Sequence, residues 1–336
     1  MSKDILSELY KKYTGQCPES VESLTGSGSN RQYFRIKGNT NLIGVCGNVD
    51  EENKAFIYMA KHFRSKGIPV PEIYSISEDG NIYIQEDLGD RLLFKEIENG
   101  RKNGIFSSEE KELIKRTISL LPDIQFKGAE DMDFSYCYPI SEFNHRTVMW
   151  DLNYFKYCFL KVSGLEFDEN LLEDDFETMS SVLLKSDSNT FMYRDFQSRN
   201  VIIKEGGPYF IDFQGGRKGP VYYDVASFLW QAKANFPKEL RDEMIDVYVN
   251  NLNKYMYIGL DDFKRTLKHF VLFRTLQVLG AYGFRGLVER KQHFLESIPF
   301  ALKNLKDIIG NGIEDYPYMS KILHNLSETE INLEYK

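Results

Sequence analysis

Three polar residues, Asp195, Asn200 and Asp212, stand at the edges of short strand-like runs in the stretch TFMYRDFQSRNVIIKEGGPYFID. Carboxylate and amide oxygens are suitable ligands for Mg²⁺, which takes only one or two ligands from a protein when it also binds phosphates. Phosphoryl transfer needs a group that orients the attacking hydroxyl and oxygens that hold the metal. The spacing therefore predicts that Asp195 handles a substrate hydroxyl, while Asn200 and Asp212 bind Mg²⁺.

The first ninety residues are predicted to form a small, strand-rich unit with one good helix. The strands are expected at Val21 to Leu24, Tyr33 to Ile36, Leu42 to Cys46, Glu72 to Ile76 and Asn81 to Glu86. A helix is expected from Glu51 to Lys66, because its apolar residues recur on one face and Gly67 ends it. The predicted order is therefore strands, one helix, then strands.

Helical periodicity dominates from Leu92 onward, and only Phe191 to Phe213 interrupts it with short β-prone runs. The expected helices cover residues 107–121, 141–163, 168–185, 222–234, 237–256, 260–284 and 296–309. The run from Glu86 to Asp90 is expected to be the hinge between the two halves. The fold class predicted is α+β, with a β-rich N-terminal part and a larger helical C-terminal part.

Composition limits the function classes. The chain has 336 residues, 42% of them apolar, with a formal charge of −8, so no overall positive field favours nucleic acid or anionic lipid. Its four cysteines form no CxxC pair, which argues against a zinc site or a disulfide framework. With neither a signal peptide nor an apolar run of membrane-spanning length, the expected location is the cytoplasm, without a membrane partner.

The segment YRDFQSRN resembles the HRDxxxxN loop of the protein-kinase superfamily, with Tyr193 in place of histidine, and IDFQ resembles its metal-binding segment. Together with SNRQYFR, IPVPEIY, QEDLG and GPVYYDVASFL, these motifs are similar to the aminoglycoside phosphotransferase and choline kinase branch. Within it the chain is most similar to bacterial anomeric kinases of N-acetylmuramate and N-acetylglucosamine, which act in cell-wall sugar recycling.

The resemblance implies a two-lobed, protein-kinase-like fold, with a nucleotide-binding lobe at residues 1–89 and a catalytic and acceptor-binding lobe at residues 90–336. It implies ATP and Mg²⁺ as cofactors and a small-molecule substrate. Asp195 would be the catalytic base or hydroxyl orienter, and Asn200 and Asp212 would bind the metal. Asp224 and Arg194 are expected to be structural, Asp224 through the N-terminal turn of a helix and Arg194 as a loop-ordering cation.

The nucleotide is expected to contact a glycine-rich turn and the hinge, because backbone amides in such a turn can approach phosphates. The residues concerned are Gly26, Ser27, Gly28, Ser29, Asn30, Arg31, Glu86 and Leu88. The third strand, NLIGVCG, lacks the lysine that kinases use to hold phosphates. Arg31 or Arg35 is predicted to replace it, although either could equally be a solvated strand residue. Glu51 and Glu52 stand where a partner glutamate would lie; a negatively charged first turn is the slightly favoured interpretation, and the partner role stays open.

The acceptor is expected to contact Gln197, Arg199, Gln214, Trp150 and Asp151. Aromatic residues at helical spacing are more often core than sugar platform, so Trp150 rests on the resemblance more than on its type. Two other functions stay open: a kinase of another small alcohol, such as an aminoglycoside, a choline-like amine or a different sugar, or a nucleotide-binding regulator without catalysis. The missing strand lysine and the histidine replacement favour the regulator, whereas the presence of Asp195, Asn200 and Asp212 argues against it.

Overall fold

The computed structural model describes residues 2–24, 31–310 and 313–328. The chain divides into two compact units, each of which is discontinuous in sequence. Unit 1 contains Met1–Glu96, Glu109–Glu142 and Tyr193–Lys218, and unit 2 contains Ile97–Ser108, Phe143–Met192 and Gly219–Lys336. The segment from Tyr193 onward thus groups with the N-terminal residues, whereas the predicted boundary between lobes at residues 89 and 90 stays a prediction.

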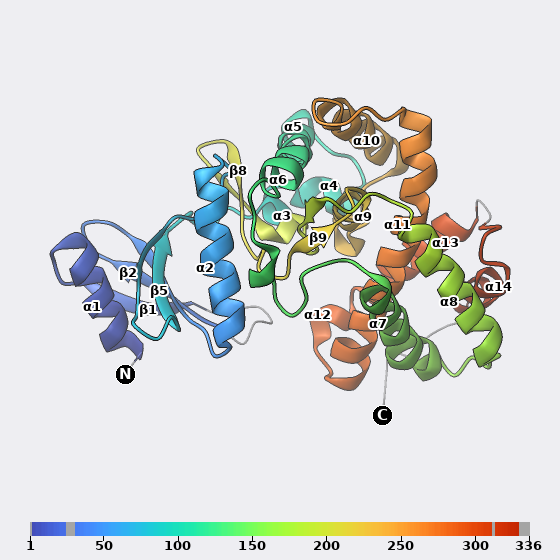
Figure 1. The fold of residues 1–336 in the computed structure, drawn as a ribbon, viewed down its shortest axis with the longest axis horizontal. Coiled ribbons are helices and arrows are strands. Elements are labelled where there is room, and N and C mark those ends of the chain that lie inside the picture. Colours follow the sequence, from blue (N-terminus) through green and yellow to red (C-terminus); the bar gives the residue numbers. More distant parts are fainter. Residues whose placement is uncertain (1, 25–30, 311–312, 329–336) are drawn as a thin grey trace. The chain divides into compact units, whose positions relative to one another are not determined.

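Unit 1 is built on a five-stranded antiparallel sheet of order β1-β2-β3-β5-β4, confirming the meander predicted for the N-terminal part (Figure 1). The strands of this sheet are β1 Ser20–Leu24, β2 Gln32–Lys37, β3 Leu42–Cys46, β4 Ile73–Ile76 and β5 Ile82–Glu86. Outside the sheet, the later strands are β7 Val201–Lys204, β8 Gly207–Phe210 and β9 Arg217–Gly219. Its helices are α1 Ser2–Thr14, α2 Asp50–Ser65, α3 Leu93–Glu96, α5 Ser108–Ser119 and α6 Leu121–Lys127, with short 3-10 turns η1 Phe134–Tyr136 and η4 Ser198–Asn200.

Helices α1 and α2 cover opposite faces of this sheet (Figure 1). Leu6 and Tyr10 of α1 are fully buried against the apolar face of β2, β3 and β5. A Cβ at Gly44 would lie 2.6 Å from Leu6 Cδ2, so the glycine lets α1 approach β3 closely. On the other face, the ring of Phe56 in α2 stacks on Tyr83 at 5.5 Å between centroids.

Helix α1 corrects the expectation that the chain begins with strands. Its buried residues Leu6, Leu9 and Tyr10 follow helical spacing, and charged residues occupy other positions of the same segment. This local signal is present in the sequence. The helix completes the core on the sheet face that α2 leaves open.

The hairpin of β7 and β8 follows the loop that contains Asp195 and Asn200. Val201 pairs with Phe210, and Lys204 pairs with Gly207. The two turn residues, Glu205 and Gly206, have φ values of +52° and +77°, as a two-residue hairpin turn of the primed type requires. This hairpin brings the chain back so that Asp212 follows β8 close to Asn200.

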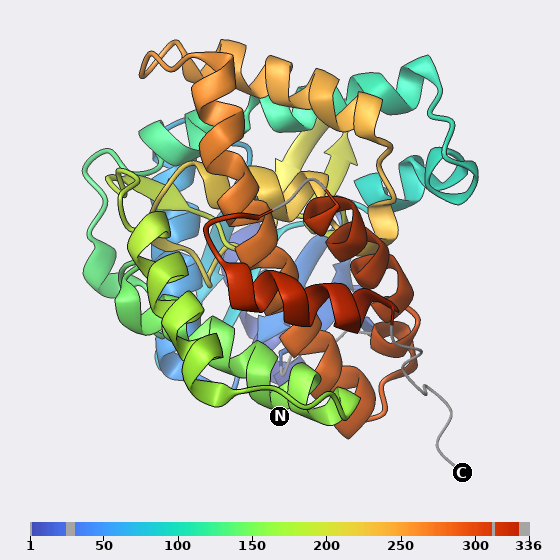
Figure 2. The ribbon, with the colours of Figure 1, turned by 90° about the vertical axis from the view of Figure 1, so that its right-hand side faces the viewer.

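Unit 2 is helical, in agreement with the predicted periodicity. Its helices are α4 Glu98–Asn103, α7 His145–Phe155, α8 Glu169–Leu183, α9 Tyr222–Leu229, α10 Lys238–Leu252, α11 Leu260–Tyr282, α12 Gln292–Leu295, α13 Ile298–Ile309 and α14 Pro317–Glu328. Shorter turns are the π-helical η2 Lys156–Leu160 and η6 Gly283–Val288, and the 3-10 turns η3 Lys161–Ser163 and η5 Ala232–Ala234, with one strand, β6 Thr190–Met192. Helix α11 packs against α7, α9 and α13 (Figure 2).

Two boundaries differ from the sequence prediction for physical reasons. Helix α7 begins at His145 rather than near residue 141, because Asn144 forms a capping box with Thr147. The helix expected at residues 107–121 ends at Ser119, and Pro122 occupies the first turn of the separate helix α6. In the described part of the chain no helix is long and apolar enough to cross a membrane.

Candidate active site

The loop after β6 places Asp195 between two aromatic anchors of unit 1. Tyr193 and Phe196 are each 1% exposed, and their rings meet edge to face at 5.5 Å. Arg194 has a φ of +74°, a left-handed conformation that is uncommon for residues other than glycine. The buried anchors on either side hold this turn, so Asp195 remains half-buried at a defined position.

Asn200 joins the two aspartates. Its Nδ2 donates to the backbone oxygen of Asp195 at 2.9 Å and to Asp212 Oδ2 at 3.2 Å. Its backbone nitrogen donates to the Gln197 carbonyl at 2.9 Å, which closes the short turn η4. The three residues predicted to carry the chemistry therefore lie together in unit 1.

Asp212 is held in a left-handed conformation, with a φ of +68°. Such a backbone costs about 1–3 kcal/mol and persists only where surrounding contacts impose it. The contacts come from Ile211, whose nitrogen donates to the Asn200 carbonyl at 3.0 Å and whose oxygen accepts from the Tyr193 hydroxyl at 2.5 Å. Strain of this kind is common where a side chain must be aimed at a ligand.

The electrostatics around Asp212 favour a cation. Solvent reaches this residue, yet the surrounding protein desolvates its carboxylate, which raises the pKa, and the charge of Asp195 raises that pKa further. Two carboxylates so close repel each other unless a positive charge lies between or beside them. The site is therefore suited to a bound metal ion.

The donor set fits Mg²⁺ better than a transition metal. Asp212 and Asn200 supply hard oxygen donors, and Mg²⁺ keeps several waters and binds phosphates as well as one or two protein groups. Over residues 2–24, 31–310 and 313–328, no group of three or more His, Cys, Asp or Glu side chains could hold a metal by itself. A metal held by Asp212 and Asn200 would complete its coordination with water or phosphate oxygens.

Arg31 is the buried cation of the site. It is 5% exposed, its Nη2 lies 3.3 Å from Glu52 Oε1 of α2, and its guanidinium lies over the Phe56 ring at 5.3 Å. Its charge lowers the pKa of Asp212, but desolvation and the charge of Asp195 have larger effects and raise that pKa. Glu52 lies in the charged first turn of α2, as predicted, and it also pairs with this arginine, which is the alternative that the sequence left open.

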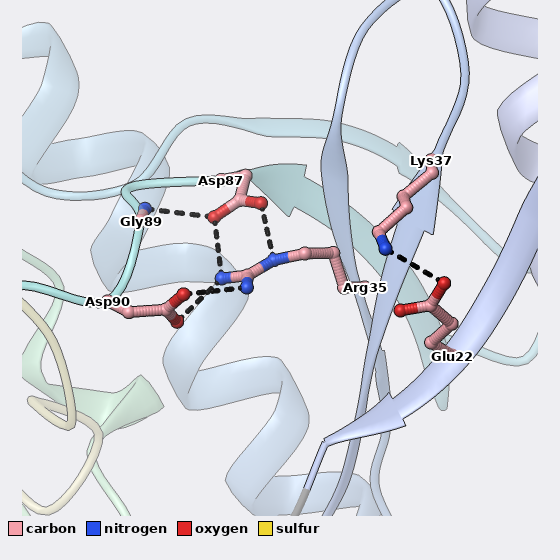
Figure 3. Close-up of polar contacts among 6 residues, drawn as sticks. All are labelled: Glu22, Arg35, Lys37, Asp87, Gly89 and Asp90. Carbon is pink, nitrogen blue, oxygen red and sulfur yellow. Dashed lines mark hydrogen bonds and ion pairs between the residues drawn. The ribbon is translucent and has the colours of Figure 1, made fainter.

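Arg35, the other predicted replacement for the strand lysine, is already neutralised (Figure 3). Its Nε lies 2.8 Å from Asp87 Oδ2, and its Nη1 and Nη2 lie 2.8 and 2.7 Å from the two oxygens of Asp90. Both aspartates raise the pKa of Arg35, mainly because Arg35 donates hydrogen bonds to the Asp90 carboxylate. A phosphate would have to displace two carboxylates to reach it, so Arg31 is the better placed arginine.

The predicted hinge, residues 86–90, contains both engaged and unengaged peptide groups among the described residues. Glu86 is engaged: its nitrogen donates to the Glu72 carbonyl at 2.9 Å and its carboxylate binds Lys204 Nζ at 2.5 Å. Within the described residues, the backbone nitrogen of Leu88 takes part in no hydrogen bond, and the side chain is buried. Contact of Glu86 and Leu88 with a base stays a prediction.

The turn residues Gly26, Ser27, Gly28, Ser29 and Asn30 lie outside the described part of the chain.

Gln214 links Glu52, the partner of Arg31, to Asp212. Its Nε2 donates to Asp212 Oδ1 at 2.9 Å and to Glu52 Oε1 at 3.3 Å. Its predicted contact with substrate stays a prediction. The sequence could not show the link, because Glu52 and Gln214 are far apart in the chain.

The other predicted acceptor residues lie in both units. In unit 1, Gln197 precedes η4, and the guanidinium of Arg199 lies 5.5 Å from the Phe94 ring of α3. In unit 2, Trp150 is 55% exposed on α7 while the adjacent Asp151 is buried. Their contacts with an acceptor stay predictions.

Asp224, the predicted structural residue of unit 2, is fully buried in the first turn of α9. A carboxylate there is stabilised by the unpaired amides and the positive end of the helix dipole. The predicted structural role of Asp224 stays a prediction.

Comparison with known proteins supports phosphoryl transfer as the chemistry of the site. The model of a phosphotransferase enzyme family, APH, matches residues 141–257. An N-acetylmuramate/N-acetylglucosamine kinase of Neisseria meningitidis serogroup B is 22% identical over 316 residues, which cover 90% of this chain and 89% of that protein. The predicted family resemblance is confirmed.

Solved structures agree with the predicted fold. A choline kinase from Cryptosporidium parvum has a TM-score of 0.64 at 13% identity and covers 96% of this chain and 100% of its own. An ADP-bound aminoglycoside phosphotransferase, APH(2'')-Ib, has a TM-score of 0.59 at 13% identity and covers 99% of each chain. The α+β, protein-kinase-like fold predicted from the sequence is thereby confirmed.

Proposed function

Since this chain is a phosphotransferase with a kinase-like fold, we propose that it is a Mg²⁺- and ATP-dependent kinase of a small molecule. The observation that carries the proposal is the single amide of Asn200, which hydrogen-bonds to both the Asp195 backbone and the Asp212 carboxylate. One side chain thus sets the distance between the group that orients a hydroxyl and the group that holds a metal. Phosphoryl transfer requires this relationship.

The residues would divide the reaction between them. Asp195 accepts a hydrogen bond from the acceptor hydroxyl and takes its proton as the hydroxyl oxygen bonds to the γ-phosphorus of ATP, while the bond to the ADP oxygen breaks. Asp212 and Asn200 would hold Mg²⁺, which when bound neutralises phosphate charge. Arg31, held by Glu52, would bind the phosphates in place of the missing strand lysine.

For the acceptor, we propose the anomeric hydroxyl of N-acetylmuramate or N-acetylglucosamine in cell-wall sugar recycling. The support is the match to a kinase of these sugars over 90% of the chain, at 22% identity. Gln197, Arg199, Gln214, Trp150 and Asp151 are the proposed acceptor contacts. Arg199 is suited to the lactyl carboxylate of N-acetylmuramate, because a guanidinium binds carboxylates through paired donors.

The proposal keeps residues 1–89 as the nucleotide-binding lobe and residues 90–336 as the catalytic and acceptor-binding lobe. We propose that the enzyme acts in the cytoplasm, where ATP is available, and we propose no nucleic acid, membrane or protein partner. A kinase of another alcohol is the second candidate, favoured by the structural likeness to a choline kinase and an aminoglycoside phosphotransferase. The inactive regulator is less favoured, because Arg31 and Tyr193 supply contacts where lysine and histidine are missing.

The test is phosphate transfer from Mg·ATP to a panel of N-acetylglucosamine, N-acetylmuramate, glucose, choline and kanamycin. The proposal expects transfer to an N-acetyl sugar, giving an acid-labile anomeric phosphate, and its loss in Asp195→Asn with Mg·ADP binding retained. Transfer only to choline, kanamycin or glucose would favour the second candidate. Nucleotide binding without transfer to any acceptor would contradict the N-acetyl sugar proposal and favour the regulator.

A further inference from the structure

We infer that Gln214 is a positioning residue that couples nucleotide binding to metal binding, through the chain of contacts Arg31–Glu52–Gln214–Asp212. The inference rests on the proposed function, because it assumes that phosphates bind near Arg31 and Mg²⁺ near Asp212. This role differs from the substrate contact that the sequence predicts for Gln214.

The chain of contacts is continuous. Arg31 Nη2 lies 3.1 Å from the Glu52 backbone oxygen and 3.3 Å from Glu52 Oε1. Gln214 Nε2 donates to the same Glu52 Oε1 at 3.3 Å and to Asp212 Oδ1 at 2.9 Å. Glu52 Oε1 of α2 therefore forms an ion pair with Arg31 and also accepts a hydrogen bond from Gln214, which in turn donates to Asp212.

The orientation of the Gln214 amide follows from its neighbours. The reverse orientation would place the carbonyl oxygen against two carboxylates, whereas the observed one gives each carboxylate a donor. The carbonyl oxygen, Oε1, is buried and accepts no hydrogen bond within the described residues. Leaving a buried acceptor unpaired costs free energy, so the two bonds of the NH₂ group are what hold the side chain here.

The charges explain why an amide serves better than an acid or an apolar side chain. Glu52 raises the pKa of Asp212, together with the larger effects of desolvation and Asp195, so the two carboxylates disfavour each other. Gln214 places a shared donor between them without adding charge. Methionine has a similar length but no donor, and asparagine has the donor but is shorter by one methylene group.

The consequence is a coupling between the two ligands. A phosphate that binds Arg31 fixes the Arg31–Glu52 pair, and through Gln214 it fixes the Asp212 oxygen that faces α2. Mg²⁺ and nucleotide should then favour each other's binding by more than their direct contact provides. Coupling of this kind typically changes an affinity by about 5- to 150-fold.

The experiment measures the dissociation constant of ADP by calorimetry, in EDTA and in saturating Mg²⁺, for wild type and variants. The dissociation constant in EDTA divided by the dissociation constant in Mg²⁺ measures the coupling between nucleotide and metal. In Gln214→Met we expect the ratio to fall at least about fivefold, with the constant in EDTA changed less than twofold. Gln292→Met, the same change at a glutamine outside the site, is the matched control and should keep the wild-type ratio.

Gln214→Asn is a second variant, in case the methionine variant does not fold, and it should also lower the ratio because its amide cannot reach both carboxylates. A wild-type ratio in either folded variant would overturn the inference alone, since the wild-type protein would still show the metal effect. Equal weakening of both constants would also overturn it, because that indicates general disruption. If wild type itself shows no Mg²⁺ effect on ADP, the proposed metal site fails and the inference fails with it.

Discussion

Replacing Tyr193 with phenylalanine removes one oxygen atom and tests whether the loop before Asp195 sets the position of Asp212. The Tyr193 hydroxyl donates to the Ile211 carbonyl at 2.5 Å, and the tyrosine is 1% exposed. Ile211 directly precedes Asp212, whose left-handed backbone needs external support. The hydroxyl therefore connects the turn that contains Asp195, the proposed base, to Asp212, the proposed metal ligand.

The expected loss of stability follows from the environment of this bond. A carbonyl that loses its partner in the interior costs about 1–3 kcal/mol. Unfolding entropy is about 2.1 cal/mol/K per residue, or about 0.7 kcal/mol/K for 336 residues, so the Tm should fall by about 1–4 °C. If Asp212 shifts by about 1 Å, kcat/KM should fall by about 10- to 100-fold.

The assay compares Tyr193→Phe with Tyr209→Phe by calorimetric melting and by steady-state transfer kinetics. Tyr209 lies on β8 of the same unit, and its hydroxyl makes no hydrogen bond within the described residues, so removing that hydroxyl should change neither quantity. If the two variants melt together and transfer phosphate at the same rate, the Tyr193 hydroxyl does not support Asp212, and this account of the strained backbone is wrong.

Three further outcomes are expected. Asp195→Asn should lower kcat by about 10²- to 10⁴-fold while the Mg·ADP-induced rise in Tm is kept, and a variant with near-normal kcat would remove Asp195 from proton transfer. Gly283→Ala should cost about 1–3 kcal/mol in urea unfolding, because its Cβ would lie 2.1 Å from the Cys158 carbonyl oxygen; an unchanged unfolding midpoint would contradict that packing. Burial raises the pKa of Cys137 to about 12, so at pH 8 its thiol stays protonated, and mass spectrometry should find that iodoacetamide labels the exposed Cys17 first; equal labelling would contradict the burial of Cys137.

The local elements are largely predictable from the sequence, since periodicity and turn residues act between near neighbours. The strands of the sheet, helix α2 and most helices of unit 2 follow the predicted ranges. The differences lie where a helix precedes the first expected strand, as in α1, or where one side chain decides a boundary. Asn144 is such a case, because its capping box with Thr147 starts α7 later than the apolar pattern suggests.

The candidate residues could also be chosen from the sequence alone, because the spacing of Asp195, Asn200 and Asp212 along the chain predicts their chemistry. Tertiary structure decided which cation accompanies them. Arg31 and Arg35 are equivalent in the sequence, but Arg35 is neutralised by Asp87 and Asp90, whereas Arg31 pairs with Glu52. These partners come from distant segments, and a charge is defined by the groups that surround it in space. No pattern of chain neighbours could therefore have distinguished the two arginines.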